Sequence, residues 1–389
     1  MKKFVKYMHG SIDNASRNKR ELSVVSKLNC EIIVCDFSEK EEKKEVNGYT
    51  VYSRKRYLSK CSLVRKFQIL YNWLVKEPNY LRQKHAYCIS CHDLTALFIG
   101  WLSTWFLPKA RKPFLIYDSH EFELGRNARR SKFIRWIIFG TEKFLIKKCA
   151  FSIMVNDTIA DEVQRIYKLK ERPVVVRNIP PYWNVDESIC KRRRKEFCEQ
   201  LGVSEDIFII MYHGGIMPGR GIENLLAVLQ GSENTVAVIL GYGEKHYIEK
   251  LRQMARDLQI EDRLLFHKAV DIDVLWQYVG AADVNMNLTQ NVAKSYFYSL
   301  PNKLFECIQA ETPVIASNFP ELVRIIRGYD IGLCVDPVSI EEIVNAVEEM
   351  RTNKEMYNSF KRNLKLAKKE LCWEKESKVL EEAYGKLLR

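Results

Sequence analysis

The sequence predicts an α/β protein made of two parallel-sheet domains, and three observations lead to this fold class. The chain has 389 residues, which is enough for two hydrophobic cores. Short apolar strands alternate with helical patterns in both halves. A polar, basic stretch interrupts this alternation near the middle. The predicted domains are therefore residues 1–180 and 205–373, joined by a linker at 181–204 and followed by a last helical segment at 374–389.

The first half is predicted to begin with a strand and to alternate strands with helices. Its strands are short apolar runs bounded by polar or turn residues: Phe4–Met8, Glu31–Asp36, Tyr49–Ser53, Tyr87–Cys91, Phe114–Asp118, Phe151–Val155 and Pro173–Val176. Helices are expected at about 15–28, within 54–82, after the fourth strand, around Trp136, and between the last two strands. The charged segment that ends at Asn47-Gly48 is expected to be a loop.

Two consecutive strands of this half end in a histidine followed by an acid, His92-Asp93 and His120-Glu121. Ligands bind beyond the carboxyl ends of strands in open parallel sheets. One such histidine is usually structural, but two together indicate a site. Gly10, directly after the first strand, would let the backbone approach a ligand closely.

The second half repeats the alternation. Its predicted strands are Ile207–Tyr212, Val236–Leu240, Arg263–His267, Asp283–Leu288, Pro313–Ser317 and Gly332–Val335. Helices are expected from Ile222, after Gly243, at Asp273–Gly280 and at Ile340–Thr352, and then from Asn353 to the end with an interruption at Trp373-Glu374.

Glycine-rich loops are predicted after the first two strands of this half. The first contains Gly214, Gly215 and Arg220, and the second contains Gly241 and Gly243. A strand, a glycine loop and a helix together can cradle a phosphate, with Arg220 as the charged contact. One glycine loop is a weak signal, and its repetition strengthens it.

The stretch Tyr296–Leu322 is predicted to form a loop, a helix, a turn, a strand and a further loop. Ser299 is the expected helix cap, and Pro301 suits the first helical turn. The start of the helix offers free backbone N–H groups, the positive end of a dipole, and Lys303, which together can hold a phosphate. Glu306 lies one turn further, where a carboxylate can accept hydrogen bonds from sugar hydroxyls. An ordinary surface helix is the alternative interpretation of this fragment alone.

Positive charge is concentrated in the first half. Residues 1–180 contain 35 Lys+Arg and 18 Asp+Glu, whereas the rest of the chain contains 27 and 31. This asymmetry favours an anionic partner, such as a membrane surface, a phosphorylated acceptor or nucleic acid.

Two segments of the first half interleave basic and aromatic residues, as expected of helices that lie on an anionic bilayer. In the first, Arg54, Lys55, Arg56, Lys60, Arg65 and Lys66 lie among Tyr57, Phe67, Tyr71 and Trp73. In the second, Trp136 and its apolar neighbours are edged by Arg129, Arg130, Lys132, Arg135, Lys143, Lys147 and Lys148. A basic helix that simply faces water is the alternative for each.

The compartment predicted from the sequence is the cytoplasm. The N-terminus is charged, and no apolar segment typical of an export signal follows it. No apolar run reaches the length of a membrane span. The eleven cysteines are therefore expected to be free thiols in a reducing environment.

Several motifs along the chain resemble those of a known family. They are Tyr-Asp-Ser-His-Glu at 117–121, His-Gly-Gly-(x4)-Arg-Gly at 213–221, Leu-Gly-Tyr-Gly at 240–243, Phe-His-Lys-Ala-Val at 266–270, Ala-Ala-Asp at 281–283, and Ser-Leu-Pro-Asn-Lys-Leu-Phe-Glu at 299–306 with Pro-Val-Ile-Ala-Ser at 313–317. The chain resembles the family 4 glycosyltransferases over nearly its whole length. The resemblance implies the GT-B fold, in which two Rossmann-like domains face each other across a cleft, and sugar transfer with retention of configuration. It also implies that the last helix, 374–389, packs back on the N-terminal domain.

The resemblance also implies roles for single residues. It places the nucleotide-diphosphate sugar in the C-terminal domain and the acceptor in the N-terminal domain, and it suggests catalytic roles for His120, Glu306 and Arg220. The implied donor-binding residues are Gly10, Gly214, Gly215, Arg220, Gly241, Gly243, His267, Lys268, Val270, Tyr298, Leu300, Pro301, Asn302, Lys303 and Glu306. His92, Asp93 and Glu121 are expected on the acceptor side.

Two positions differ from the family pattern. Tyr298 stands where the first signature glutamate is usual, and Gly215 stands where the partner arginine of the glycine loop is usual. A subset of the family with the same 299–306 segment shares the Tyr-Ser pattern. The sequence is therefore interpreted as carrying a variant donor site.

The predicted function is the transfer of a sugar from a nucleotide-diphosphate donor to an acceptor hydroxyl. No metal and no cofactor are expected, because Arg220, Lys303 and the helix start at Pro301 can meet the charge of the leaving diphosphate. The expected acceptor is a lipid-linked saccharide of bacterial capsule, exopolysaccharide or lipopolysaccharide assembly. The expected location is the inner face of the cell membrane, with no nucleic-acid partner.

Two other functions are consistent with parts of the sequence. A sugar-nucleotide epimerase on the same fold would use the donor site but would not need a basic, aromatic first half. A non-catalytic protein that binds membranes or nucleic acid would use the basic segments, but it would leave the glycine loops and the 296–322 stretch without a purpose.

Overall fold

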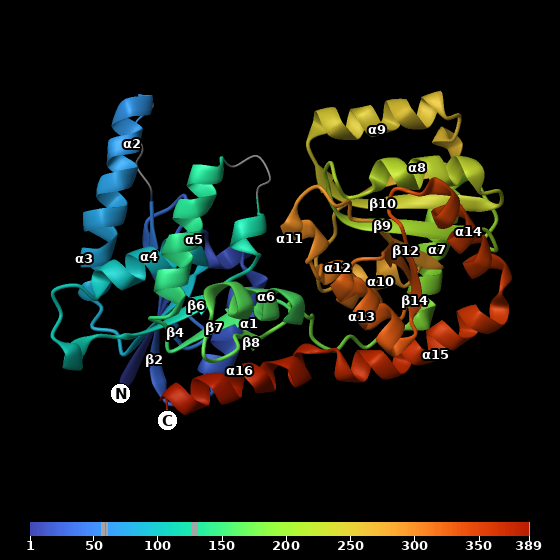
Figure 1. Cartoon of the computed structure of the whole chain (residues 1–389). Helices are drawn as coiled ribbons and strands as arrows, with labels where there is room; N and C mark the ends of the chain where they lie inside the picture. The colour runs from blue at the N-terminus through green and yellow to red at the C-terminus, as the bar shows by residue number, and fades with distance from the viewer. Residues whose placement is uncertain (56–58, 60, 127–130, 389) are drawn as a thin grey trace. The chain divides into compact units, whose positions relative to one another are not determined.

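The computed structural model of the chain describes residues 1–55, 59, 61–126 and 131–388. They form two α/β units, each with its own sheet, as Figure 1 shows. The predicted fold class, two parallel-sheet Rossmann-like domains, is confirmed.

The chain divides by its internal contacts into two compact units. Unit 1 contains Met1–Arg177 together with Ser377–Arg389, and unit 2 contains Asn178–Glu376. In unit 1, the Tyr384 ring packs against Phe4 and Phe151 at centroid distances of 5.4 and 5.3 Å.

Unit 1 has an eight-stranded sheet in the order β3-β4-β2-β1-β5-β6-β7-β8. Its strands are β1 (Lys2–Tyr7), β2 (Cys30–Phe37), β3 (Glu42–Val46), β4 (Tyr49–Arg54), β5 (Cys88–His92), β6 (Phe114–Asp118), β7 (Phe151–Met154) and β8 (Val174–Val175). All neighbours are parallel except β3 and β4. The register places His92 at the end of β5 beside Asp118 at the end of β6.

The segment before Asn47-Gly48 is not a loop, as predicted, but strand β3. It pairs antiparallel with β4. Asn47 and Gly48 have φ angles of +49° and +82°, which the tight turn of a two-residue hairpin requires and which these residue types tolerate. The Asn-Gly dipeptide was the sequence signal for this hairpin.

The helices of unit 1 cover its sheet. They are α1 (Ser16–Val25), α2 (Ser62–Tyr71), α3 (Glu77–Arg82), α4 (Asp93–Ser103), α5 (Lys132–Ile146), α6 (Asp157–Tyr167) and the end of α16 (Trp373–Leu388), with short turns of other helix types at Ile12–Asn14, Asn72–Lys76, Lys109–Arg111 and Glu123–Gly125.

Among the described residues of the basic segment 54–82, the first helix begins at Ser62. Arg54 ends strand β4, where its guanidinium lies 2.7 Å from the Glu77 carboxylate and 3.8 Å from the centre of the Tyr80 ring. Because this arginine is engaged inside unit 1, the prediction that it contacts a membrane is wrong. Arg56, Tyr57 and Lys60 of the same prediction, and Arg129 and Arg130 of the second segment, lie outside the described residues.

Unit 2 has a six-stranded parallel sheet in the order β11-β10-β9-β12-β13-β14. Its strands are β9 (Phe208–Ile216), β10 (Thr235–Gly243), β11 (Leu264–Lys268), β12 (Val284–Asn287), β13 (Val314–Ser317) and β14 (Gly332–Val335). Ile209 and Met211 join one hydrophobic core, and Ile210 and Tyr212 join another. Since side chains alternate along a strand, the sheet is buried on both faces.

The helices of unit 2 are α7 (Glu187–Leu201), α8 (Ile222–Gly231), α9 (Lys245–Asp257), α10 (Leu275–Val279), α11 (Lys294–Phe297), α12 (Asn302–Gln309), α13 (Pro320–Tyr329), α14 (Ile340–Thr352) and α15 (Lys354–Glu370), with a 3₁₀ turn at Glu261–Arg263. The stretch 181–204, predicted as a linker, thus contains α7. Its buried face, with Phe197 and Cys198, packs into a core of unit 2, and this apolar face was hidden among many charges.

Two further observations concern the cysteines and the length of the helices. All eleven cysteines lie within the described residues and are free thiols. Across the described ranges, none of the helices combines the length and the apolar character needed to span a bilayer.

Candidate functional site

In unit 2, polar side chains gather where strands β9 and β12 end and helix α12 begins. His213 of β9 is buried, and its Nε2 lies 2.8 Å from the Glu306 carboxylate of α12. Its Nδ1 lies 2.9 Å from the amide nitrogen of Asn285 on β12. With the Asn285 amide donating to Nδ1, Nε2 carries the proton and donates to Glu306. These two hydrogen bonds in series orient the Glu306 carboxylate. The Glu306 side chain is 15% exposed.

Two cations lie near the start of α12. The Lys303 amine is buried, 4.0 Å from the centre of the Tyr212 ring, and makes no hydrogen bond within the described part of the chain. Burial, and then the nearby Arg220 charge, lowers the pKa of Lys303 to about 7. The Arg220 guanidinium lies 5.1 Å from the Tyr296 ring. An anion bound here would relieve the repulsion and favour the charged amine.

Strand β12 carries further buried polar atoms that have no hydrogen bond among the described residues. They are Oδ1 of Asn285, both amide atoms of Asn287, and Oγ1 of Thr289 just beyond the strand. Asn285 and Asn287 lie on the same face, because side chains alternate along a strand. Buried polar groups normally have partners. These buried polar atoms therefore indicate a polar ligand at the carboxyl end of β12.

The glycines predicted to form loops lie mainly inside strands. Gly214 and Gly215 belong to β9, and Gly241 and Gly243 belong to β10. A Cβ atom on Gly241 would lie 1.9 Å from the Gly214 carbonyl oxygen. These glycines let two strands approach each other closely, so the prediction that they form two loops is wrong.

The turn that does leave the sheet is 217–221. Gly221, which precedes α8, has a φ of +75°, and a Cβ atom there would lie 2.1 Å from the Leu288 carbonyl oxygen. Arg220, just before it, is held next to the end of β12 by this close approach.

The rest of the 298–303 stretch surrounds the start of α12. Pro301 is the N-cap residue, Asn302 is exposed, and Leu300 is buried. The expected capping role of Ser299 is wrong, because its hydroxyl donates to the Tyr296 carbonyl at 2.7 Å. Tyr298, which stands where a glutamate is usual, ends α11 with the Lys294 amine 5.0 Å from its ring centre.

His267, Lys268 and Val270, which the resemblance implies as donor-binding residues, lie on and after β11, an edge strand of the unit 2 sheet. The His267 ring is tilted against the Tyr278 ring at a centroid distance of 5.1 Å, and its Nδ1 lies 2.7 Å from the Lys268 carbonyl oxygen. Lys268 is exposed, whereas Val270 packs against the core. Strand β10 separates this edge from β9, which carries His213.

In unit 1 the two strand-end histidines meet. The ring centroids of His92 and His120 are 3.8 Å apart. His120 Nε2 lies 3.2 Å from an Asp118 carboxylate oxygen, and His92 Nδ1 lies 3.1 Å from the Asn18 side-chain oxygen. Burial, and then the charge of His120, lowers the pKa of His92 to about 2, so His92 is neutral.

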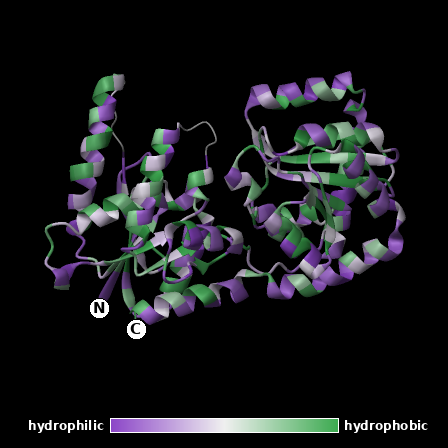
Figure 2. Cartoon of the chain, in the orientation of Figure 1, coloured by the Kyte–Doolittle hydropathy of each residue, from purple (hydrophilic) through white to green (hydrophobic). Residues whose placement is uncertain are grey.

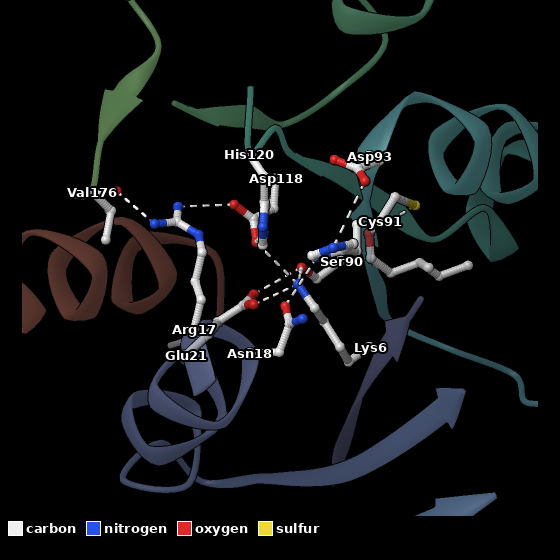
Figure 3. A network of polar contacts seen from close by, with 12 residues as sticks. Lys6, Arg17, Asn18, Glu21, Ser90, Cys91, Asp93, Asp118, His120 and Val176 are labelled. Carbon is white, nitrogen blue, oxygen red and sulfur yellow. Dashed lines mark hydrogen bonds and ion pairs between the residues drawn. The ribbon is translucent and has the colours of Figure 1, made fainter. Parts of the chain in front are cut away.

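A buried charge network around Asp118 holds His120, as Figure 3 shows. The Lys6 amine, which is fully buried, contacts Glu21 at 2.5 Å and Asp118 at 3.2 Å. Arg17 contacts the other Asp118 oxygen at 3.0 Å. Burial alone would raise the pKa of Asp118, but the Arg17 and Lys6 cations hold it well below its usual range. Asp118 is therefore ionised and fixes the orientation of His120.

The other predicted residues of unit 1 lie at its surface or near this network. Asp93 lies 3.8 Å from His92 and has a φ of +70°, and burial raises the pKa of its carboxyl group. Glu121 is half exposed and pairs with Arg126 at 3.3 Å. Gly10 is exposed, and a Cβ atom there would meet nothing within 4 Å.

His92, Asp118 and His120 offer ligand atoms within 4.8 Å of one another, a spacing that a metal ion could use. The charges argue against this use. Both oxygens of Asp118 already face cationic side chains, Arg17 on one side and Lys6 on the other. A divalent ion would have to enter beside these two charges, so the three residues fit a hydrogen-bonded cluster better than a metal centre.

Sequence reasoning missed Lys6, Arg17, Glu21, His213 and Asn285 as parts of these sites. Lys6 left a signal, because it interrupts an apolar strand. His213 appeared in a motif without a role. Nothing in the sequence indicated Asn285.

Residues 193–367 match the family model described as "Glycosyl transferases group 1". An uncharacterized glycosyltransferase of Methanocaldococcus jannaschii is 24% identical over 346 residues, which cover 88% of this chain and 83% of that protein.

Two solved structures show the same fold. Sucrose-phosphate synthase from Thermosynechococcus elongatus superposes with a TM-score of 0.76 at 17% identity, over 100% of this chain and 99% of that one. Anabaena HepE in complex with UDP superposes with a TM-score of 0.74 at 13% identity, over 99% and 100%. At these identities the likeness concerns the fold.

Proposed function

We propose that the chain is a group 1 glycosyltransferase, the family whose model matches residues 193–367, and that it moves a sugar from a nucleotide-diphosphate donor to an acceptor hydroxyl with retention of configuration. The observation that carries the proposal is the set of groups at the start of α12. An oriented carboxylate, Glu306, lies on the same helix as a buried amine, Lys303, that has no hydrogen bond among the described residues.

Each of these groups matches one part of the donor. The N–H groups at the start of α12, Lys303 and Arg220 would hold the diphosphate. Glu306, fixed by His213, would accept hydrogen bonds from the ribose hydroxyls. The buried polar atoms of Asn285 and Asn287 would gain partners when the donor binds.

The same cations would serve catalysis. When the glycosidic bond breaks, negative charge develops on the leaving diphosphate, and fixed positive groups lower the energy of that state. Lys303 and Arg220 supply such charge, so the proposed reaction needs no metal ion. His120, oriented by Asp118, is assigned the side of the reacting sugar, and His92, Asp93 and Glu121 are assigned the acceptor side.

The proposed acceptor is a lipid-linked saccharide of bacterial surface polysaccharide assembly, used at the inner face of the cell membrane. Support comes from α2 and α5, along which hydrophilic and hydrophobic residues are interleaved (Figure 2). The most exposed apolar residues of these helices are Leu63, Phe67, Phe133 and Trp136, which are 64–70% exposed. Lysines and arginines flank them, as in helices that lie on anionic lipid.

The donor half of the proposal is tested by screening nucleotide sugars for thermal stabilisation of the full chain. A ligand at 100 times its dissociation constant stabilises the folded protein by about 2.7 kcal/mol, so a bound donor is expected to raise the melting temperature clearly. The donor that does so is then incubated with the protein alone. Release of an epimerised sugar would identify an epimerase instead, and the absence of any stabilising nucleotide sugar would contradict the proposal.

The membrane half is tested by flotation with vesicles that contain anionic phospholipid. Binding is expected at low salt and is expected to weaken as salt rises, because each Lys or Arg near the surface contributes about 1 kcal/mol. Phe67→Ala with Trp136→Ala should weaken flotation several-fold. Leu366→Ala is the matched control, because Leu366 is also 63% exposed but lies on α15. No flotation of the unchanged protein at low salt would remove the membrane from the proposal.

A further inference from the structure

A cavity of about 940 Å³ lies in unit 1 at the edge of the sheet where the strands begin. Lys2 opens strand β1 and Phe114 opens strand β6, and both line the cavity. The histidines His92 and His120 follow the opposite, carboxyl ends of β5 and β6. The cavity is therefore separate from the histidine cluster of the same unit.

Cationic side chains from three distant segments converge on this cavity. They are Lys2, Lys3, Arg82, Lys109, Arg111 and Lys112. No aspartate or glutamate is among the residues that line it. Like charges around a concave surface repel one another and focus a positive potential, which an anionic ligand would neutralise.

The cations differ in how far they are already engaged. Lys3 pairs with Glu31 at 3.5 Å, and the Lys2 amine donates to the Leu388 carbonyl at 3.0 Å. Lys109, Arg111 and Lys112 make no side-chain hydrogen bond or ion pair with any described residue. These three, in and beside the short helical turn 109–111, are available to a ligand.

A second cavity of unit 1 provides a contrast. It measures about 470 Å³ and is lined by Lys147, Lys168, Lys170 and Arg172. Glu171 lies in its lining, and Arg172 pairs with Asp157 at 2.7 Å and Asp161 at 2.6 Å. Acids thus compensate part of the charge of this cavity, whereas Lys109, Arg111 and Lys112 of the larger cavity pair with no acid among the described residues.

The larger cavity also offers aromatic rings. Tyr87 and Phe114 line it with their ring centroids 5.4 Å apart, and Phe114 is 46% exposed. A planar base can stack on an exposed ring of this kind. A ligand with several phosphates and a base would use both the cations and the rings.

We propose that this cavity is a second, non-catalytic binding site for a soluble polyphosphate of the nucleotide type. Its phosphates contact Lys109, Arg111 and Lys112, and its base lies on Phe114. The site does not depend on the donor site of unit 2, and its ligand does not touch the reacting groups. A bound nucleotide there would act as an effector rather than as a substrate.

The test measures pyrophosphate binding by calorimetry on the full chain carrying Arg220→Ala, which weakens the donor site. Binding is expected to persist in this background and to weaken on the order of tenfold when Arg111→Ala and Lys112→Ala are added. Lys168→Ala with Lys170→Ala removes the same charge from the compensated cavity and should leave the affinity unchanged. Equal losses in the two double variants, or no pyrophosphate binding in the Arg220→Ala chain, would overturn the proposal.

The proposed stacking of a base on Phe114 is tested separately, in the same Arg220→Ala background. Phe114→Ala is expected to weaken the binding of ATP by about tenfold while leaving pyrophosphate binding unchanged. An equal loss for both ligands would overturn the assignment of a base to this ring. Binding to phosphatidylglycerol vesicles but to neither soluble anion would overturn the assignment to a soluble ligand.

Discussion

Replacing Glu306 by alanine is expected to weaken the binding of the nucleotide diphosphate by roughly 10- to 100-fold, because hydrogen bonds to a charged group contribute about 1.5–3 kcal/mol. The substitution removes the proposed acceptor for the ribose hydroxyls. It also leaves Nε2 of the buried His213 without its 2.8 Å partner. Calorimetric titration of the full chain with the donor found by screening measures the loss.

The companion substitution, Arg220→Ala, is expected to act on the diphosphate end of the donor. It should weaken donor binding strongly and should also lower kcat by about 10²–10³, the effect of removing one fixed group that stabilises transition-state charge. Arg220→Lys is expected to restore part of kcat, because it restores the charge without the planar guanidinium.

A matched control separates these effects from a general change in charge. Glu244 also carries a carboxylate in unit 2, but its side chain is 81% exposed. Glu244→Ala should leave donor binding and kcat unchanged. Unchanged donor affinity in both Glu306→Ala and Arg220→Ala would contradict the assignment of the donor site to the start of α12.

Replacing Lys6 by methionine is expected to destabilise unit 1 by about 3–5 kcal/mol, the usual cost of removing one partner of a buried ion pair. Lys6 is fully buried and contacts both Glu21 and Asp118. Methionine fills a similar volume but leaves Glu21 without its cation. For a unit of this size, the melting temperature should fall on the order of 10 °C.

Lys3→Met is the matched control for this prediction. Lys3 lies on the same strand, and its side chain and that of its partner Glu31 are 39% and 40% exposed. Exposed pairs of this kind contribute less than about 1 kcal/mol. Scanning calorimetry should therefore show a large shift for Lys6→Met and almost none for Lys3→Met. Shifts of equal size would mean that the buried network does not stabilise the unit.

The pH dependence of the stability that Lys6 contributes follows from the direction in which its pKa is shifted. Burial alone would lower the pKa of Lys6, but the Glu21 and Asp118 carboxylates raise it above its ordinary value. A raised folded-state pKa gives stability that is fully present below the ordinary pKa of lysine and is lost only as the pH rises through the folded-state value. The difference in the free energy of unfolding between Lys6→Met and the unchanged protein should therefore be the same at pH 6 and pH 8.

Most strands and helices were predictable because their signal is local. The apolar run of Phe114–Asp118, for example, became strand β6 with the predicted bounds. The helix at Ile340–Thr352 also has its predicted bounds. Failures arose where a local signal was overlooked or hidden, as in the Asn47-Gly48 hairpin and the charged helix α7.

The candidate sites were predictable only in part. The helix start with Lys303 and Glu306 could be located because a proline, a lysine and a glutamate follow one another at helical spacing. The roles of Gly241 and Gly243 were misjudged, because a glycine looks the same whether it serves a loop or a close approach between strands.

The sequence by itself determined the alternation of strands and helices, the positive charge of the first half, and the residues at the start of α12. These depend on side-chain periodicity and on neighbours within a few positions. The tertiary structure alone decided which partners those residues have. Glu306 meets His213 across 93 positions of sequence, and Lys6 meets Asp118 across 112. The ionisation of Asp118 and the orientation of Glu306 depend on burial and on such distant charges, which no local pattern contains.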